Sequence, residues 1–143
     1  DGALRAVRND GTVAQNVFAI GDVARFANPI FDDVPRRVEH WNIPTDSAKR
    51  VGQVLAAQLA GEDASALLAE AFAPIPSFWS DQYDIHLLAF GLLGLAEKIK
   101  LLHGEIEGDC VFGYYRESRM VGVAGIGMRS TVQGYRSEFK LEG

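Results

Sequence analysis

The sequence has few residues of several kinds, and each scarcity excludes a class of protein. With one cysteine, Cys110, the chain cannot form an internal disulfide, which suits a reducing cytoplasm. No apolar run reaches the about 18 residues that a membrane-spanning helix needs, so we expect no membrane span. Lys and Arg number 14 against 19 Asp and Glu, whereas nucleic-acid binding needs clustered positive charge. The three histidines have no ligand-like spacing, so we expect no metal site.

The chain also lacks a GxGxxG motif, the glycine-rich turn that cradles the phosphates of a dinucleotide. Gly122, Gly125 and Gly127 have the wrong spacing and fall within a predicted strand instead of a strand-to-helix turn. The chain begins Asp1-Gly2 without an initiator Met, and we expect it to be the later part of a longer protein. The dinucleotide cradles would then lie upstream.

The composition predicts a folded protein of one or two small domains. Hydrophobic residues make up 48% and charged residues 23% of the 143 residues, which are ordinary globular values. The Ala-Pro-Ile-Pro stretch at 73–76 is a stiff connector, and the sequence changes character beyond it. We therefore predict a first domain over residues 1–72 and a second over residues 73–143.

The first domain is predicted to contain strands and a long helix. Residues 4–7 predict a short strand, 17–20 a buried strand of a parallel sheet, and 26–35 a surface loop. The long helix is predicted to begin near Pro44 and to end at Gly61, and a short second helix to cover 62–71. Its capping oxygens would come from Thr45, Asp46 and Ser47, and its apolar face from Val51, Val54, Leu55 and Leu59.

The second domain is predicted to be an antiparallel sheet with a closing helix. Strands are expected over 85–90, 98–104, 110–115 and 120–126, with hairpin turns at Gly108-Asp109 and Glu117-Ser118. A helix is expected over 130–141, because Val132, Tyr135, Arg136 and Phe139 share a face. We interpret Cys110 as a buried structural thiol and His86 as an outward-facing side chain.

The segment VFAIGD, Val17 to Asp22, is the strongest sign of a binding site. An apolar strand that ends in Gly-Asp suits the edge of a sheet where ligands bind. Gly21 permits close approach of a ligand, and Asp22 supplies an acceptor for a sugar or polyol hydroxyl. Gly-Asp is also a common turn, so the alternative is that Asp22 only caps the turn.

Three segments together carry a family resemblance: VFAIGD, VEHWNIP (38–44) and FWSDQYD (78–84). The chain resembles the C-terminal portion of FAD-dependent pyridine-nucleotide oxidoreductases of the ferredoxin, rubredoxin and putidaredoxin reductase type. The three segments occur in the family's order, and the resemblance covers nearly the whole chain. It implies an α/β fragment of a FAD-binding domain, followed by a small α+β antiparallel reductase C-terminal domain of the dimerisation type.

The resemblance also implies which residues meet the flavin. Gly21, Asp22 and Val23 would lie at the ribityl chain of FAD. Glu39, His40 and Trp41 would precede a helix that points at the isoalloxazine, and Trp79 would approach from the second domain. The alternatives are a solvated rim for Glu39 and His40, a core aromatic for Trp41 and a domain anchor for Trp79. The chain departs from the family at Ile43-Pro44, where Pro44 removes a backbone donor, and at Ser47-Ala48.

The function that the resemblance implies is electron transfer. The parent protein would pass a hydride from NAD(P)H to FAD, and then electrons to a ferredoxin-type iron–sulfur protein in the cytoplasm. Relatives of the same fold reduce other acceptors, such as oxygen, quinones or disulfides. A third hypothesis is that the chain is an assembly or docking module without activity of its own. By itself we expect it to bind FAD weakly and to self-associate, for example as a homodimer.

Overall fold

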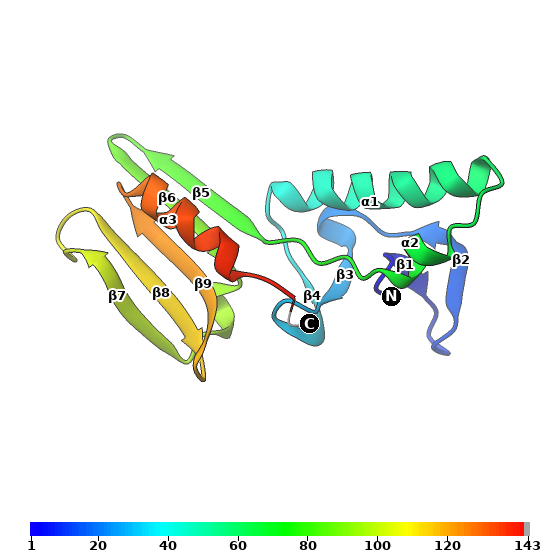
Figure 1. Ribbon diagram of the computed structural model, residues 1–143, viewed down its shortest axis with the longest axis horizontal. Helices are drawn as coiled ribbons and strands as arrows, with labels where there is room; N and C mark the ends of the chain where they lie inside the picture. The colour runs from blue at the N-terminus through cyan, green and yellow to red at the C-terminus, as the bar shows by residue number, and fades with distance from the viewer. Residues whose placement is uncertain (142–143) are drawn as a thin grey trace. The chain divides into compact units, whose positions relative to one another are not determined.

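The computed structural model describes residues 1–141, and the chain divides into two compact units (Figure 1). The first unit is Asp1–Pro74, and the second begins at Ile75. All strand pairs in the described residues are antiparallel. No helix among them has the length and apolar character needed to cross a membrane.

The first unit opens with a hairpin of β1 (Arg5–Val7) and β2 (Val13–Phe18). Gly11, at φ +84°, allows the tight turn between them. The predicted strand at 4–7 is confirmed, whereas the described residues do not show the buried parallel strand predicted at 17–20, of which only residues 17 and 18 are extended, as the end of β2. Among the described residues β2 pairs with β1 alone, in antiparallel fashion, so it lacks the neighbours that bury a parallel strand on both faces. Val17 is accordingly 55% exposed and Ile20 41% exposed.

A second hairpin, β3 (Arg25–Asn28) and β4 (Asp32–Arg37), replaces the loop predicted over 26–35. The turn covers only residues 29–31, and Asn28 and Asp32 are the paired strand residues at its two ends. The Asn28 side chain accepts from the Ile30 N–H at 3.2 Å and donates to the Pro74 carbonyl at 2.7 Å. Pro35 is tolerated because β4 pairs on one side only in the described chain.

The long helix, α1 (Asn42–Leu59), begins two residues before Pro44 and is followed by Gly61 at φ +72°, as predicted. In the described chain the N-cap residue, Trp41, makes no side-chain capping hydrogen bond, so the predicted capping by Thr45, Asp46 and Ser47 is not found. Leu55 and Leu59 are exposed, contrary to the predicted apolar face. The buried residues of α1 are Ile43, Ser47, Arg50, Val51, Val54 and Ala57.

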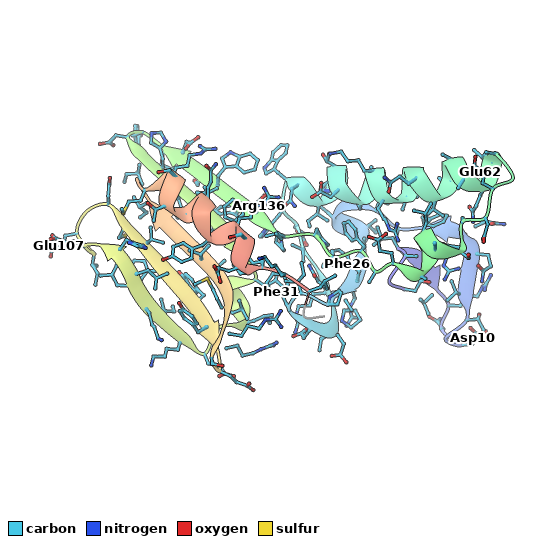
Figure 2. The ribbon with its side chains drawn as sticks, in the orientation of Figure 1. Asp10, Phe26, Phe31, Glu62, Glu107 and Arg136 are labelled. Carbon is cyan, nitrogen blue, oxygen red and sulfur yellow. The ribbon has the colours of Figure 1, made fainter. Side chains whose placement is uncertain are left out.

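The chain at and after α2 (Ser65–Ala69) is held to α1 and to the second hairpin by buried contacts. Arg50, although buried, donates to the carbonyls of Leu67 and Glu70 at the end of α2. Phe26, labelled in Figure 2, packs edge-on against Phe72 with ring centroids 4.9 Å apart. These contacts tie the chain after α2 to β3 and to α1.

The second unit is a five-stranded antiparallel sheet (Figure 1). In the order of the sheet, its strands are β5 (Ser77–Gln82), β6 (Ile85–Gly91), β9 (Arg119–Ile126), β8 (Cys110–Arg116) and β7 (Lys98–Gly104). The four predicted strands and both predicted hairpin turns are confirmed, whereas β5 was not predicted. A short 3-10 turn, η2 (Leu93–Leu95), follows β6. Cys110 is buried and His86 is exposed, as expected.

One face of this sheet is covered by α3 (Arg129–Gly134) and the 3-10 turn η3 (Tyr135–Glu138), as Figure 1 shows. The predicted helix over 130–141 is therefore too long. Of the residues predicted to share a helix face, Val132 and Phe139 are buried, whereas Arg136 is exposed. Val132 rests directly on the backbone of Gly125, because a Cβ built at Gly125 would lie 2.5 Å from Val132 Cγ2.

This contact predicts that Gly125→Ala destabilises the second unit by about 1–3 kcal/mol, because the added methyl overpacks a close contact. The methyl would also lie 2.8 Å from the Cys110 carbonyl oxygen. Gly94→Ala is the matched control, since a Cβ at Gly94 meets nothing within 4 Å. Chemical denaturation followed by tyrosine and tryptophan fluorescence measures both variants. Equal stability of the two would show that α3 does not press on β9.

Candidate functional site

Four of the predicted site residues line one hollow of about 200 Å³ in the first unit. The 3-10 turn η1 (Gly21–Val23) provides Asp22, and the segment before α1 provides the other three. The lining residues are Asp22, Glu39, His40, Trp41 and Pro44. Segments about 20 residues apart in the sequence thus meet at the start of α1.

Gly21 is buried behind the hollow and ties η1 to α1. Its φ of +67° is a conformation that glycine adopts readily. Its N–H donates to Ser47 Oγ at 3.0 Å, and Ser47 Oγ donates to the Ile43 carbonyl at 2.6 Å. The Ala24 N–H donates to the Gly21 carbonyl at 3.0 Å and closes the turn. The turn that carries Asp22 is therefore anchored to the first turn of the helix.

The Asp22 carboxylate faces solvent at the hollow. In the part of the chain that the structure describes, no hydrogen bond or ion pair engages it. Its backbone carbonyl accepts from Arg37 Nε at 3.0 Å, and the same guanidinium pairs with the Glu39 carboxylate. The acceptor oxygens of Asp22 are thus available to a hydroxyl-bearing ligand, while the backbone beneath them is held.

Trp41 presents an apolar surface beside this carboxylate. The indole is 78% exposed, which is unusual for a large aromatic residue and excludes the core-aromatic alternative within the described chain. Trp41 immediately precedes α1, whose amino end carries a partial positive charge. Pro44, in the first turn, contributes no N–H donor. An acceptor carboxylate, an indole and a helix amino end together suit a ligand with a polyol and a flat, electron-accepting ring.

His40 is a partly buried member of the lining. Partial burial lowers its pKa below 6.5, because the charged imidazolium loses hydration. Its carbonyl accepts from the Ile43 N–H at 3.0 Å, which adds to the order of the chain entering α1. A neutral imidazole therefore lines the hollow at neutral pH.

Three predicted site residues lie outside this lining. Gly21 is buried, and Val23, in the same 3-10 turn as Asp22, is 76% exposed. Trp79 lies in β5 of the second unit, opposite Leu88, and is 43% exposed. The role of Trp79 at the flavin stays a prediction.

Sequence reasoning did not identify Ser47 and Arg37 as parts of the site. Ser47 was assigned to helix capping, and only the folded structure brings it to Gly21, 26 residues away. Arg37 lies in a strand that the sequence predicted in part as a loop. The signal that could have found Ser47 is its position on the buried face of α1, because a buried polar side chain needs a hydrogen-bond partner.

The burial of His40 predicts a pH dependence of stability. Because the folded-state pKa is lowered, the unfolded chain binds a proton that the folded chain does not, and stability falls as pH drops through 6.5 toward the folded pKa. His40→Asn should lose this part of the dependence in urea denaturation between about pH 7 and 5. His86→Asn, which removes an exposed histidine, is the control. A His40→Asn protein with the wild-type pH dependence would contradict the prediction.

Comparisons with known proteins found one family match and several similar proteins. Residues 77–140 match the family described as Reductase C-terminal. A relative from Burkholderia cepacia, the ferredoxin–NAD(+) reductase component of the anthranilate 1,2-dioxygenase system, is 30% identical over 129 residues. That match covers 90% of this chain and 29% of the relative.

Solved structures show the same relationship. The ferredoxin reductase from Rhodopseudomonas palustris is 28% identical, with a TM-score of 0.67 over 84% of this chain and 27% of that one. Putidaredoxin reductase, in its covalent complex with putidaredoxin, shares the fold at 23% identity, with a TM-score of 0.70 over 96% of this chain and 31% of that one. The chain spans about three tenths of the length of these relatives. The chain thus resembles the C-terminal portion of ferredoxin and putidaredoxin reductases, and residues 77–140 match the reductase C-terminal family.

Proposed function

We propose that this chain is the C-terminal part of a flavoprotein reductase that passes electrons from NAD(P)H through FAD to a ferredoxin-type iron–sulfur protein in the cytoplasm. The first unit would complete the FAD-binding domain, and the second would be the reductase C-terminal domain. The observation that carries the proposal is the hollow shared by the Asp22 carboxylate and the Trp41 indole at the start of α1.

The residues at the hollow fit a flavin. The Asp22 carboxylate can accept hydrogen bonds from the ribityl hydroxyls, and no group in the described chain competes for it. The amino end of α1 stabilises negative charge by about 0.3–1 kcal/mol, or up to about 2 when partly buried. That is enough to tune a reduction potential, but not enough to supply most of the binding. When bound, the flavin supplies the hydride and electron transfer.

The chain's own residues would bind and orient this group. Arg37 and Ser47 hold the turn beneath Asp22 through the Asp22 carbonyl and the Gly21 N–H. Trp41 offers an apolar wall, and neutral His40 adds no positive charge to the hollow at neutral pH. Glu39 also lines the hollow, whereas the proposed roles of Val23 and Trp79 at the flavin rest on the family resemblance alone.

Other parts of the proposal rest on the relatives. The Burkholderia cepacia relative is named as a ferredoxin–NAD(+) reductase component, which favours a ferredoxin-type acceptor here. An alternative acceptor such as oxygen, a quinone or a disulfide stays open. The exposed Val17 and Ile20 of the first unit favour self-association of the 143-residue chain when it is separated from its parent.

The full-length protein that carries this sequence tests the proposal. We expect it to purify with bound FAD and to reduce cytochrome c with NADH or NADPH only when a [2Fe–2S] ferredoxin is added. The 143-residue chain alone is the control, and it should bind FAD weakly and elute as a dimer. A full-length protein without flavin would contradict the proposal, as would cytochrome c reduction of equal rate without ferredoxin.

Asp22→Ala in the full-length protein should raise the dissociation constant for FAD by about 10–100-fold, because a hydrogen bond to a charged group contributes about 1.5–3 kcal/mol. Asp33→Ala removes an exposed carboxylate of β4 that does not line the hollow, and it is the matched control. Fluorescence titration of apoprotein with FAD measures both. If the two variants bind FAD equally well, Asp22 is only a turn residue.

A further inference from the structure

We propose that Ser47 is a positioning residue for the ribityl chain of FAD, acting through Gly21. Its hydroxyl holds η1 against the first turn of α1 and so sets where the Asp22 carboxylate stands at the hollow. This inference rests on the proposed function, because it assigns a role to Ser47 at the same site.

The contacts of Ser47 join two segments that are far apart in the sequence. The side chain is fully buried, and its Oγ accepts from the Gly21 N–H at 3.0 Å. The same hydroxyl donates to the Ile43 carbonyl at 2.6 Å, and the Pro44 carbonyl is a second acceptor at 3.2 Å. A hydroxyl has one donor and two acceptor positions, so it can accept and donate at once. The bond between helix and turn therefore has a directed geometry.

The position of the Asp22 carboxylate depends on its backbone. Its side chain is not held by any partner in the described residues, so its position depends on the two bonds that tie the backbone of the turn to other segments, one to Ser47 and one from Arg37. The bond from Arg37 comes from a side chain that is 56% exposed, where solvent weakens such interactions. The bond to Ser47 is buried, and without it the Gly21 N–H would be left without a partner away from water. Ser47 is the stronger of the two restraints.

Helix stability does not explain a serine at this position. Serine has a lower helix propensity than alanine, and a hydroxyl that bonds back to the i−4 carbonyl slightly destabilises a helix. A small apolar residue would suit the buried stripe of α1 better if packing were its only role. What the hydroxyl adds is the acceptor for Gly21.

Two isosteric variants of the full-length protein isolate the hydroxyl. Ser47→Thr keeps it, Ser47→Val removes it, and both add similar volume, so any packing strain is shared. We expect the dissociation constant for FAD to be about tenfold higher in Ser47→Val than in Ser47→Thr. Amide hydrogen exchange in the apoproteins should show Gly21 less protected in Ser47→Val than in Ser47→Thr. This second readout does not depend on flavin or activity.

Val54→Ala is the control for general destabilisation of α1, because Val54 is fully buried in the same helix and is not part of the site. It should lower the free energy of unfolding while leaving FAD affinity within about twofold of wild type. Equal FAD affinity in Ser47→Val and Ser47→Thr would overturn the role of Ser47, as would equal losses in Ser47→Val and Val54→Ala. A wild-type protein that binds no FAD would instead overturn the proposed function.

Discussion

The hydrogen bond from the Gly21 N–H to Ser47 Oγ is the interaction on which the candidate site depends. It is buried, so losing it would leave a backbone donor without a partner and without water. On one side of the bond lies the turn that carries Asp22, and on the other lies the first turn of α1, just after Trp41. A carboxylate and an indole from distant segments line the same hollow because this bond fixes their backbones to each other.

The second unit is organised by a different constraint, close packing over small residues. Val132 can rest on β9 because Gly125 has no side chain, and the strand pairing places Gly125 opposite Val111 and Leu88. A six-residue helix would have little stability in water by itself. The sheet supplies the surface on which α3 buries Val132. This unit is the part that matches the reductase C-terminal family directly.

Much of the fold could be predicted because local signals and tertiary structure agree there. Recognisable turn residues separate strands β7, β8 and β9 in the sequence. Pro44 marks the start of α1 and Gly61 its end. The predictions fail where strand formation or burial depends on a segment that is distant in the sequence. An apolar run such as 17–20 is buried only if strands flank it, and β3 and β4 are strands because they pair with each other. Helical periodicity predicted that Leu55 and Leu59 belong to the apolar face, but in the folded unit Val51 and Val54 are buried and both leucines are exposed.

The sequence by itself determined the family resemblance and the residue types of the site, because the Gly-Asp turn and the Glu-His-Trp segment are contiguous and keep their chemistry in any fold. It also determined the alternation that builds the second sheet. Only the tertiary structure decided that Ser47 binds Gly21, that Arg37 holds the carbonyl of Asp22, and that Trp41 stays exposed. Those are contacts and burial, which depend on how distant segments pack and therefore cannot be read from local sequence.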